Sequence, residues 1–351
     1  MAKNFNVRLI AITIGYLFMS ISVKSQGIFS PRNVVNQYTT VGFGGGSSHY
    51  YGDLSPYSHA LNGLYTNVRW NLNANYTKYI TPNTALRLQL SWIRILGDDY
   101  SYSQRNLDLF WQGYIRNLHF RNDIKEVALS GIFNLIPQYG KGGSRNRNAF
   151  TPYATIGIGL MAHDPKATLP LSISATKTWQ SLRQYNTSGQ TIPGSTIKTY
   201  SLVQAVLPLG LGMRFKVNSR IDIVLEGNVR LTKTDYLDDV GDSNYANLTQ
   251  LSSYSGPNGA ALSYRATEAI NSRTGINRIP LLQQIYSDPS KLNGGVIGQG
   301  WSPDVFAAYY GPDGQKSLKR GSKAILNDAY ATAQFTISYI ISDKIKCPVL
   351  N

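Results

Sequence analysis

The chain has 351 residues, a mean hydropathy of -0.21 and a formal net charge of +15. No stretch approaches the roughly eighteen continuous apolar residues of a membrane-spanning helix, so the sequence excludes helical spanning segments. The single cysteine, Cys347, excludes an intrachain disulfide framework.

Residues 1–25 predict a secretory signal peptide. Lys3 and Arg8 precede an apolar run from Leu9 to Met19, and small or polar residues follow it. We therefore expect a mature domain over residues 26–351. An exported basic chain rarely meets nucleic acid, so no nucleic-acid partner is expected, and outer-membrane lipid or an acidic protein is the better match for the charge.

Six segments along the chain alternate between apolar and polar residues with a period of two, the pattern of a strand with one apolar face. In the segment 84–92, for example, Leu86, Leu88 and Leu90 alternate with Arg87 and Gln89. The six segments span residues 39–47, 68–80, 84–92, 124–136, 152–161 and 331–341.

The clearest alternation lies in two further segments, 207–217 and 221–232, which meet at a tight turn. Both are about as long as a tilted strand must be to cross a bilayer. With the six others they predict an all-β fold, an eight-stranded antiparallel transmembrane β-barrel with long extracellular loops.

The connections differ in length. The turns at 81–83 and 218–219 are tight and the one at 138–151 is modest, whereas four others are long. Bacterial barrels have short periplasmic turns and long outer loops, so both termini are expected in the periplasm. The fourth long loop is expected to be largely irregular, although Trp301 to Tyr310 suits packing on the barrel mouth. The predicted outer loops lie near 48–67, 93–123, 162–204 and 233–329.

An eight-stranded barrel is narrow enough to be filled by its own side chains. Because buried charges persist when they are paired, we expect a lattice of arginines and glutamates in the lumen. A proton or ion path is the alternative, and it needs an open lumen. The charged residues predicted to face the lumen are Arg69, Arg87, Glu126, Arg214, Glu226 and Arg230.

Two acidic motifs follow predicted strands at their outer ends. Their spacing does not fit a calcium-binding loop, so a cation site is the weaker alternative. We expect their aspartates to cap turns and to pair with arginines at the barrel rim. The motifs are Tyr51, Gly52, Asp53 and Leu54, and Thr234, Asp235, Tyr236, Leu237, Asp238 and Asp239.

With these motifs the chain resembles the Bacteroidota outer-membrane β-barrel family that includes PorG, a component of the type IX secretion system. The resemblance implies an outer-membrane barrel that docks periplasmic secretion-ring proteins. Besides the two acidic motifs, it rests on Arg116 to Phe120 with Glu126, Pro152-Tyr153 with Gly157 to Gly159, Asp164 to Ala167, Glu226 with Arg230, and Cys347-Pro348.

Two features of the predicted periplasmic side suit contact with a partner. One is a basic turn from Lys141 to Arg147, and the other is the thiol near the C-terminus. An ordinary solvated turn and a tolerated thiol are the alternatives. The possible contact residues are Lys141, Arg145, Arg147 and Cys347.

Catalysis is the remaining alternative, because some small outer-membrane barrels are enzymes. Ser47 or Ser48, His49 and Asp53 contain the residue types of a hydrolytic triad, but the sequence has no nucleophile-elbow or H-E-x-x-H motif. We expect no enzymatic activity, cofactor, metal or small-molecule substrate. The histidines outside this set are expected to be interfacial or solvated, and they are His59, His119 and His163. A surface ligand-binding or adhesion barrel remains a further alternative.

Overall fold

The computed structural model describes residues 38–56, 60–136, 147–241, 244–288, 291, 319–321 and 327–341. Several predicted features lie outside these residues: the signal peptide, His59, Lys141, Arg145, Trp301 to Tyr310 and Cys347.

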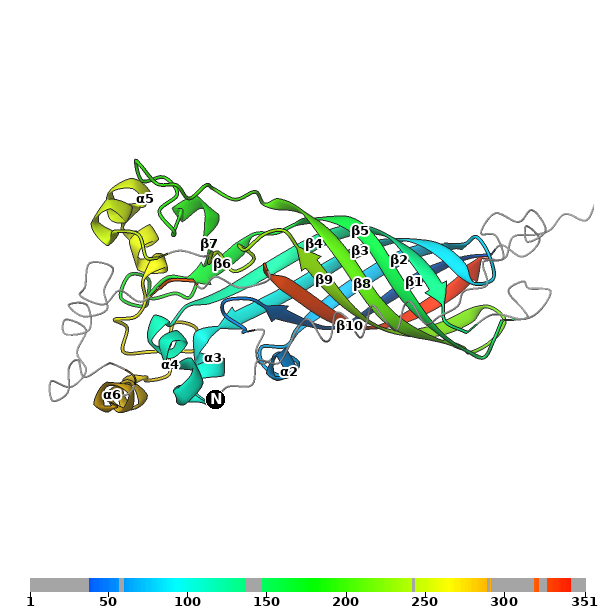
Figure 1. Ribbon diagram of the computed structural model, residues 1–351, viewed down its shortest axis with the longest axis horizontal. Coiled ribbons are helices and arrows are strands. Elements are labelled where there is room, and N and C mark those ends of the chain that lie inside the picture. Colours follow the sequence, from blue (N-terminus) through cyan, green and yellow to red (C-terminus); the bar gives the residue numbers. More distant parts are fainter. Residues whose placement is uncertain are drawn as a thin grey trace, which may run out of the picture.

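The described chain is built around a closed antiparallel barrel of eight strands (Figure 1). Its strands neighbour one another in the order β3, β2, β1, β10, β9, β8, β5, β4, and pairing of β3 with β4 closes the ring. The predicted fold is confirmed. The barrel strands are β1 (Thr39–Tyr51), β2 (Arg69–Tyr79), β3 (Thr84–Asp98), β4 (His119–Asn134), β5 (Phe150–Ala162), β8 (Val203–Lys216), β9 (Ile221–Thr232) and β10 (Ala329–Ile341).

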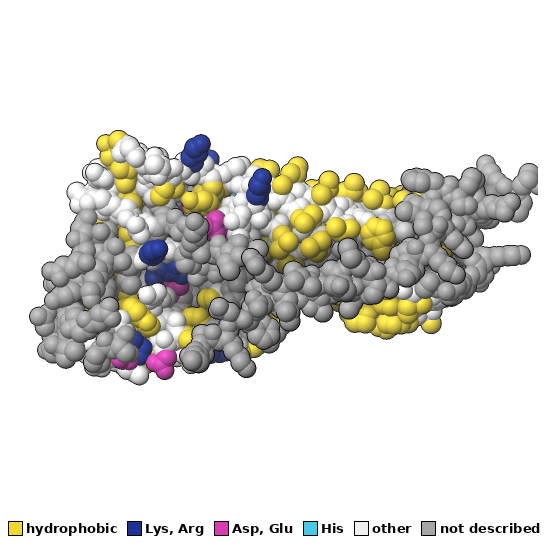
Figure 2. All heavy atoms as spheres, in the orientation of Figure 1, with side chains coloured by type: hydrophobic (Ala, Val, Ile, Leu, Met, Phe, Trp, Pro, Cys, Tyr) yellow, Lys and Arg dark blue, Asp and Glu magenta, His cyan; other side chains and the backbone are white. Residues whose placement is uncertain are grey.

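Alternation along each strand places large apolar side chains on the outside of the barrel. On β9, Leu225 and Val229 are 40% and 45% exposed, whereas Glu226 and Asn228 between them are buried. Figure 2 shows hydrophobic side chains gathered along the barrel wall. Such a surface suits hydrocarbon, and a closed barrel leaves no unpaired strand edge in it. The barrel is therefore membrane-spanning.

Two strands extend further than the alternation indicated. β3 continues to Asp98 and β4 begins at His119, so the connection expected at 93–123 is largely strand. In the extension Ile93, Ile95 and Leu96 are all buried. Residues of both faces are covered there, which removes the period-two signal that revealed the rest of each strand.

At the end opposite the tight turns, the connections fold into a compact layer that we call the cap (residues 52–56, 60–68, 99–118, 163–202, 233–241, 244–288 and 319–321). No helix in the described residues is long and apolar enough to cross a membrane. The cap contains α2 (Ala60–Gly63), α3 (Asp99–Ser103), α4 (Leu107–Arg116), β6 (Pro165–Thr168), β7 (Trp179–Ser181), a 3-10 turn (Arg183–Tyr185), α5 (Leu248–Ser263) and α6 (Ile279–Ser287).

Two of these helices, α5 and α6, lie in the connection that was expected to be irregular. The side chain of Asn247 caps the start of α5 by accepting from the amide of Gln250. Gly256, with φ of 75°, then interrupts the helix just before Pro257. This break hides the helical periodicity in the sequence.

Apolar packing ties the cap to the barrel. One buried cluster crosses the barrel mouth, and a second joins α4 to α5 and α6. The first includes Tyr50, Leu54, Ile93, Phe120, Met161, Leu237 and Tyr330, and the second includes Tyr114, Ile115, Tyr245, Tyr264, Leu282 and Ile285.

Candidate functional site: the charged lumen and the motif junction

The middle of the lumen is crossed by an ion pair between β3 and β9. Arg87 donates two parallel hydrogen bonds to Glu226, with N–O distances of 2.6 and 2.8 Å. Tyr153 on β5 and Asn228 on β9 also donate to this carboxylate. All are buried. The bidentate geometry and the additional donors satisfy a charge that would be costly alone.

A second pair joins β9 to β4 closer to the cap. Arg230 Nε donates to Glu126 Oε2 at 2.9 Å, and the guanidinium also donates to Thr332 on β10. The hydroxyl of Tyr330 donates to the same carboxylate at 2.6 Å. Four residues from three strands thus form one network across the barrel.

The tight-turn end is closed by a third group of charges. Arg214 donates to the hydroxyl of Tyr79 and lies 4.0 Å from Asp222. Arg147 pairs with Asp222 at 2.6 Å and donates to the carbonyls of Asn218 and Ser219. We expected Arg147 in a solvated turn available to a partner, and this was wrong. Arg147 is buried because its side chain packs against Asp222 and the turn at 218–219.

The network leaves little free volume in the lumen. A cavity of about 30 Å³ lies among the inward side chains, and Arg87, Arg214, Asp222 and Glu226 line it. A water needs roughly 10–15 Å³ of such space, so the cavity has room for two or three waters.

Arg69 does not belong to the lumen lattice, contrary to expectation. It lies at the cap end of β2, is only partly buried, and donates to the carbonyl of Val68. Its charged neighbours are Arg273, Asp98 and Arg94. The residue sits at the end of the alternating segment, where the inward direction leads into the cap and no longer into the lumen.

The structure brings the two acidic motifs together on one tyrosine. The hydroxyl of Tyr50 lies 2.7 Å from Asp238 Oδ2 and 2.8 Å from Asp328 Oδ1. Leu54 and Leu237 pack in the same buried cluster. A side chain at Gly52 would collide with Tyr50 and Asp328, which explains the glycine of the first motif.

The geometry of this junction favours a protonated carboxyl group. The Tyr50 hydroxyl has one hydrogen but contacts two carboxyl groups, so one of the contacts needs a protonated carboxyl. Burial, together with the charge of Asp53, raises the pKa of Asp238 well above its usual value. Burial and the charge of Asp238 do the same to the pKa of Asp328. We expected rim aspartates to pair with arginines, and Asp238 pairs instead with a tyrosine.

Asp239 does pair with an arginine. Its carboxylate lies 3.2 Å from Arg320 Nη2 and accepts hydrogen bonds from Tyr200 and Thr187. Burial nevertheless raises its pKa. The residue has a positive φ of 68°, which an aspartate in a tight turn tolerates. Asp239 thus joins the second motif to the third and fourth connections.

Three of the histidines are buried structural groups, and for His119 and His163 this corrects the interfacial or solvated position that we expected. His49, His119 and His163 are each 5% exposed or less. His49 contacts Ser47 Oγ at 3.0 Å, but its other ring nitrogen contacts the carbonyl of Gly63. Neither of these two hydrogen bonds of His49 reaches Asp53, so they do not form the suggested triad. Within the described ranges, no group of three acidic, histidine or cysteine residues is placed to hold a metal ion.

Sequence reasoning missed several residues that organise the cap. Asp328 lies just before β10 and belongs to no motif in the sequence, yet its carboxyl group accepts a hydrogen bond from the amide of Leu237. Arg116 was noted only for the resemblance; it pairs with Asp99 and donates to the carbonyls of Asp53 and Arg320. Only its position at the last turn of an amphipathic helix could have indicated its role.

No family model matches the chain, and no curated protein does. Among solved structures, the chain is similar to Ail, the attachment invasion locus protein of Yersinia pestis, at 7% identity and a TM-score of 0.33, covering 87% of this chain and 99% of that chain. Neisserial surface protein A gives 7% identity, a TM-score of 0.33 and coverage of 86% and 96%. The N-terminal β-barrel domain of Pseudomonas aeruginosa OprF is 7% identical, with a TM-score of 0.30, and the match covers 87% of this chain and 98% of that chain.

Likenesses at this level carry no argument, so the assignment rests on the chain itself. Strand pairing closes the barrel, the outside is apolar and the lumen is filled. This combination is the architecture of small bacterial outer-membrane barrels. The chain is an outer-membrane β-barrel protein.

Proposed function

We propose that this barrel is a non-enzymatic structural or docking subunit of a type IX protein secretion machine. The observation that supports this best is the filled lumen, which Arg87–Glu226 and Arg230–Glu126 cross at two levels. A barrel that conducts nothing works through its two ends and its outer wall. Among the roles that such a barrel can have, we choose secretion because the sequence resembles the PorG family.

The proposed topology follows from the lengths of the connections. A signal peptide exports the chain, the tight-turn end and both termini face the periplasm, and the cap faces the outside. Secretion-ring proteins then meet the tight-turn end. Of the basic turn, Lys141 and Arg145 remain as contact candidates because Arg147 is committed to Asp222.

A charge-reversal experiment tests this docking. Lys141→Glu combined with Arg145→Glu should weaken capture of periplasmic secretion-ring proteins from detergent-solubilised outer membrane, and raised salt should weaken it further. Arg147 must be left alone, because its reversal would place a negative charge against Asp222 and confuse folding with docking.

The matched control reverses two exposed cations of the cap, Arg105 and Lys198. It changes the net charge by the same amount, and capture should remain at the wild-type level. Loss of secretion in this control, with normal capture and secretion by the tight-turn variant, would contradict docking. Deleting a long stretch of the cap is a poor control, because Arg265 and Ser272 are buried in it.

A surface-binding role is the second candidate, and the cap favours it. The cap is packed around two apolar clusters, and a cavity of about 390 Å³ opens beside α3 and α4. Tyr102, Phe110, Arg116 and Lys319 are among the residues that line it. Its lining mixes aromatic and charged side chains, so it could bind a ligand that is both apolar and polar. Capture of an extracellular ligand that Phe110→Ala abolishes, with periplasmic docking unaffected, would establish this role.

A further inference from the structure

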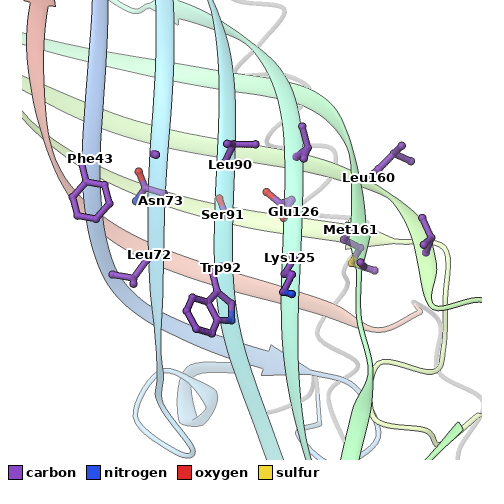
Figure 3. Close-up of a pocket in the computed structure, with 14 residues that line it drawn as sticks. Phe43, Leu72, Asn73, Leu90, Ser91, Trp92, Lys125, Glu126, Leu160 and Met161 are labelled. Carbon is purple, nitrogen blue, oxygen red and sulfur yellow. The ribbon is translucent and has the colours of Figure 1, made fainter. Parts of the chain in front are cut away.

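The lipid-facing wall of the barrel has a hollow near the cap (Figure 3). Its volume is about 550 Å³, and it extends over β1 to β5 and the start of β8. The small side chains of Ala74 and Ala162 lie in it, and Ala74 is flanked in register by Phe43 and Leu90. Small residues between large ones leave this groove in the apolar wall.

Lys125 stands at the rim of this groove. It is an exposed, outward-facing residue of β4, and strand register places it between Trp92 and Ala162. Figure 3 shows Lys125 and Trp92 on neighbouring strands. Among the described residues, Lys125 has no ion-pair partner. No described carboxylate therefore neutralises its charge.

The position of Lys125 matches the boundary between hydrocarbon and head groups. The next outward residue toward the barrel middle, Val127, is apolar and 50% exposed. The next toward the cap, Asp123, is held by Arg94 at 2.5 Å and has Arg121 at 3.8 Å. One carboxylate between two guanidinium groups leaves this strip positive as well. Tryptophan and basic residues at this level are typical of membrane interfaces.

We propose that the groove binds an anionic, phosphate-bearing lipid of the surrounding bilayer, with an acyl chain along Ala74 and Leu90 and its phosphate at Lys125. Lys125 supplies a charge-assisted hydrogen bond, and the positive Arg94–Asp123–Arg121 strip favours the same anion. With the cap outside, this lipid belongs to the outer leaflet. The inference rests on the membrane-spanning barrel and not on its role in secretion.

A second copy of the chain is a poorer occupant. A two-fold interface over the groove would bury both Lys125 side chains without a described carboxylate partner, because such interfaces use the same patch on both subunits. The charge that suits a phosphate would then oppose association. A lipid satisfies both the apolar groove and the cation at its rim.

Native mass spectrometry of the purified barrel tests the proposal. The protein is reconstituted with equal amounts of phosphatidylglycerol and phosphatidylcholine, released into mild detergent, and the retained lipid is counted. Wild type should retain phosphatidylglycerol preferentially. Lys125→Gln should reduce that preference about fivefold, the factor equivalent to one basic side chain at an anionic surface. Lys125→Arg should restore it.

The matched control is Lys78→Gln. Lys78 is an exposed lysine on the outward row of β2, at the opposite end of the barrel and away from the groove. Its loss should leave the retained lipid unchanged. Filling the groove with Ala74→Leu should lower retention of both lipids, because it occupies the space of the acyl chain.

Three results would overturn the proposal. The first is equal loss in the Lys78 and Lys125 variants, which would indicate only a general attraction to anionic lipid. The second is a wild-type preference that survives both Lys125→Gln and Ala74→Leu. The third is dimers in the spectrum that Ala74→Leu abolishes, which would assign the groove to a second copy. None of these outcomes bears on capture of secretion proteins, which is measured separately.

Discussion

Single residues decide the stability of this barrel where charge is buried. Glu226 accepts from Arg87, Tyr153 and Asn228, so one carboxylate fixes three other side chains. Such a pair adds little stability relative to an apolar core. Removing one partner, however, leaves the other charge buried without a counter-ion, which is costly.

We expect Glu226→Ala to destabilise the barrel by about 3–5 kcal/mol, because the buried Arg87 guanidinium then lacks its counter-ion. Reversible urea unfolding in lipid vesicles measures this, with heat-modifiable gel migration as a second readout. The double variant Glu226→Gln with Arg87→Met removes both charges and should cost less than the single variant. An unchanged free energy of unfolding for Glu226→Ala would show that the pair is not formed.

A second residue-scale prediction concerns pH. The pKa values of Asp238 and Asp328 are raised from an ordinary value of 3.8, so the folded cap binds a proton that the unfolded cap releases more readily. The stability from that proton is complete below the ordinary pKa and is lost as pH rises through the folded-state pKa. The charged or titratable groups facing the pair are Tyr50, Asp53, Asp235 and Arg116.

Hydrogen exchange of cap amides, corrected for intrinsic rates, should therefore show protection that declines as pH rises from about 4. Asp328→Asn should flatten this dependence, since the amide needs no proton and still contacts Tyr50. A cap that becomes more protected with rising pH would contradict the assignment.

The sequence predicts the lumen residues well but not their partners. Alternation alone places Arg87, Glu126, Glu226 and Arg230 inside. Which arginine meets which glutamate depends on the strands that face one another across the closed ring, and no local pattern contains that information. Asp328 was missed for the same reason: its partners, Tyr50 and Leu237, are distant in sequence.

At the scale of elements, the period-two pattern found all eight barrel strands because hydrocarbon demands an apolar outer face at every other residue. The same pattern failed beyond the membrane. There β3 and β4 bury both faces, and α5 is broken at Gly256. The sequence therefore predicts the barrel more completely than the cap.

The lipid-facing orientation of one row of β9 side chains can be tested by placing a charge at two depths in the bilayer. Leu225→Arg, in the middle of the lipid-facing row, should cost about 2–4 kcal/mol, whereas Leu231→Arg, near the cap end of the same row, should cost about 0–1 kcal/mol. A charge near the interface reaches the head groups, and one at mid-depth does not. Unfolding in vesicles gives both values. Equal costs would show that the row does not cross the bilayer as described.

At the scale of the whole molecule, the protein is a closed barrel with charged side chains packed in its lumen. Three groups of charges close the lumen: Arg230–Glu126 toward the cap, Arg87–Glu226 in the middle, and Arg147–Asp222 at the tight turns. These pairs join walls that are far apart in sequence.

Single-channel recording in a planar bilayer tests this central claim most directly. The purified barrel should insert without producing stable conductance steps, because the lumen cavity of about 30 Å³ offers ions no continuous path. A disrupted lumen gives the comparison: Glu126→Ala with Glu226→Ala removes two of the carboxylates that hold the arginines in place. Reproducible, long-lived conductance steps from the wild-type barrel would contradict a filled lumen and would show that ions pass through it.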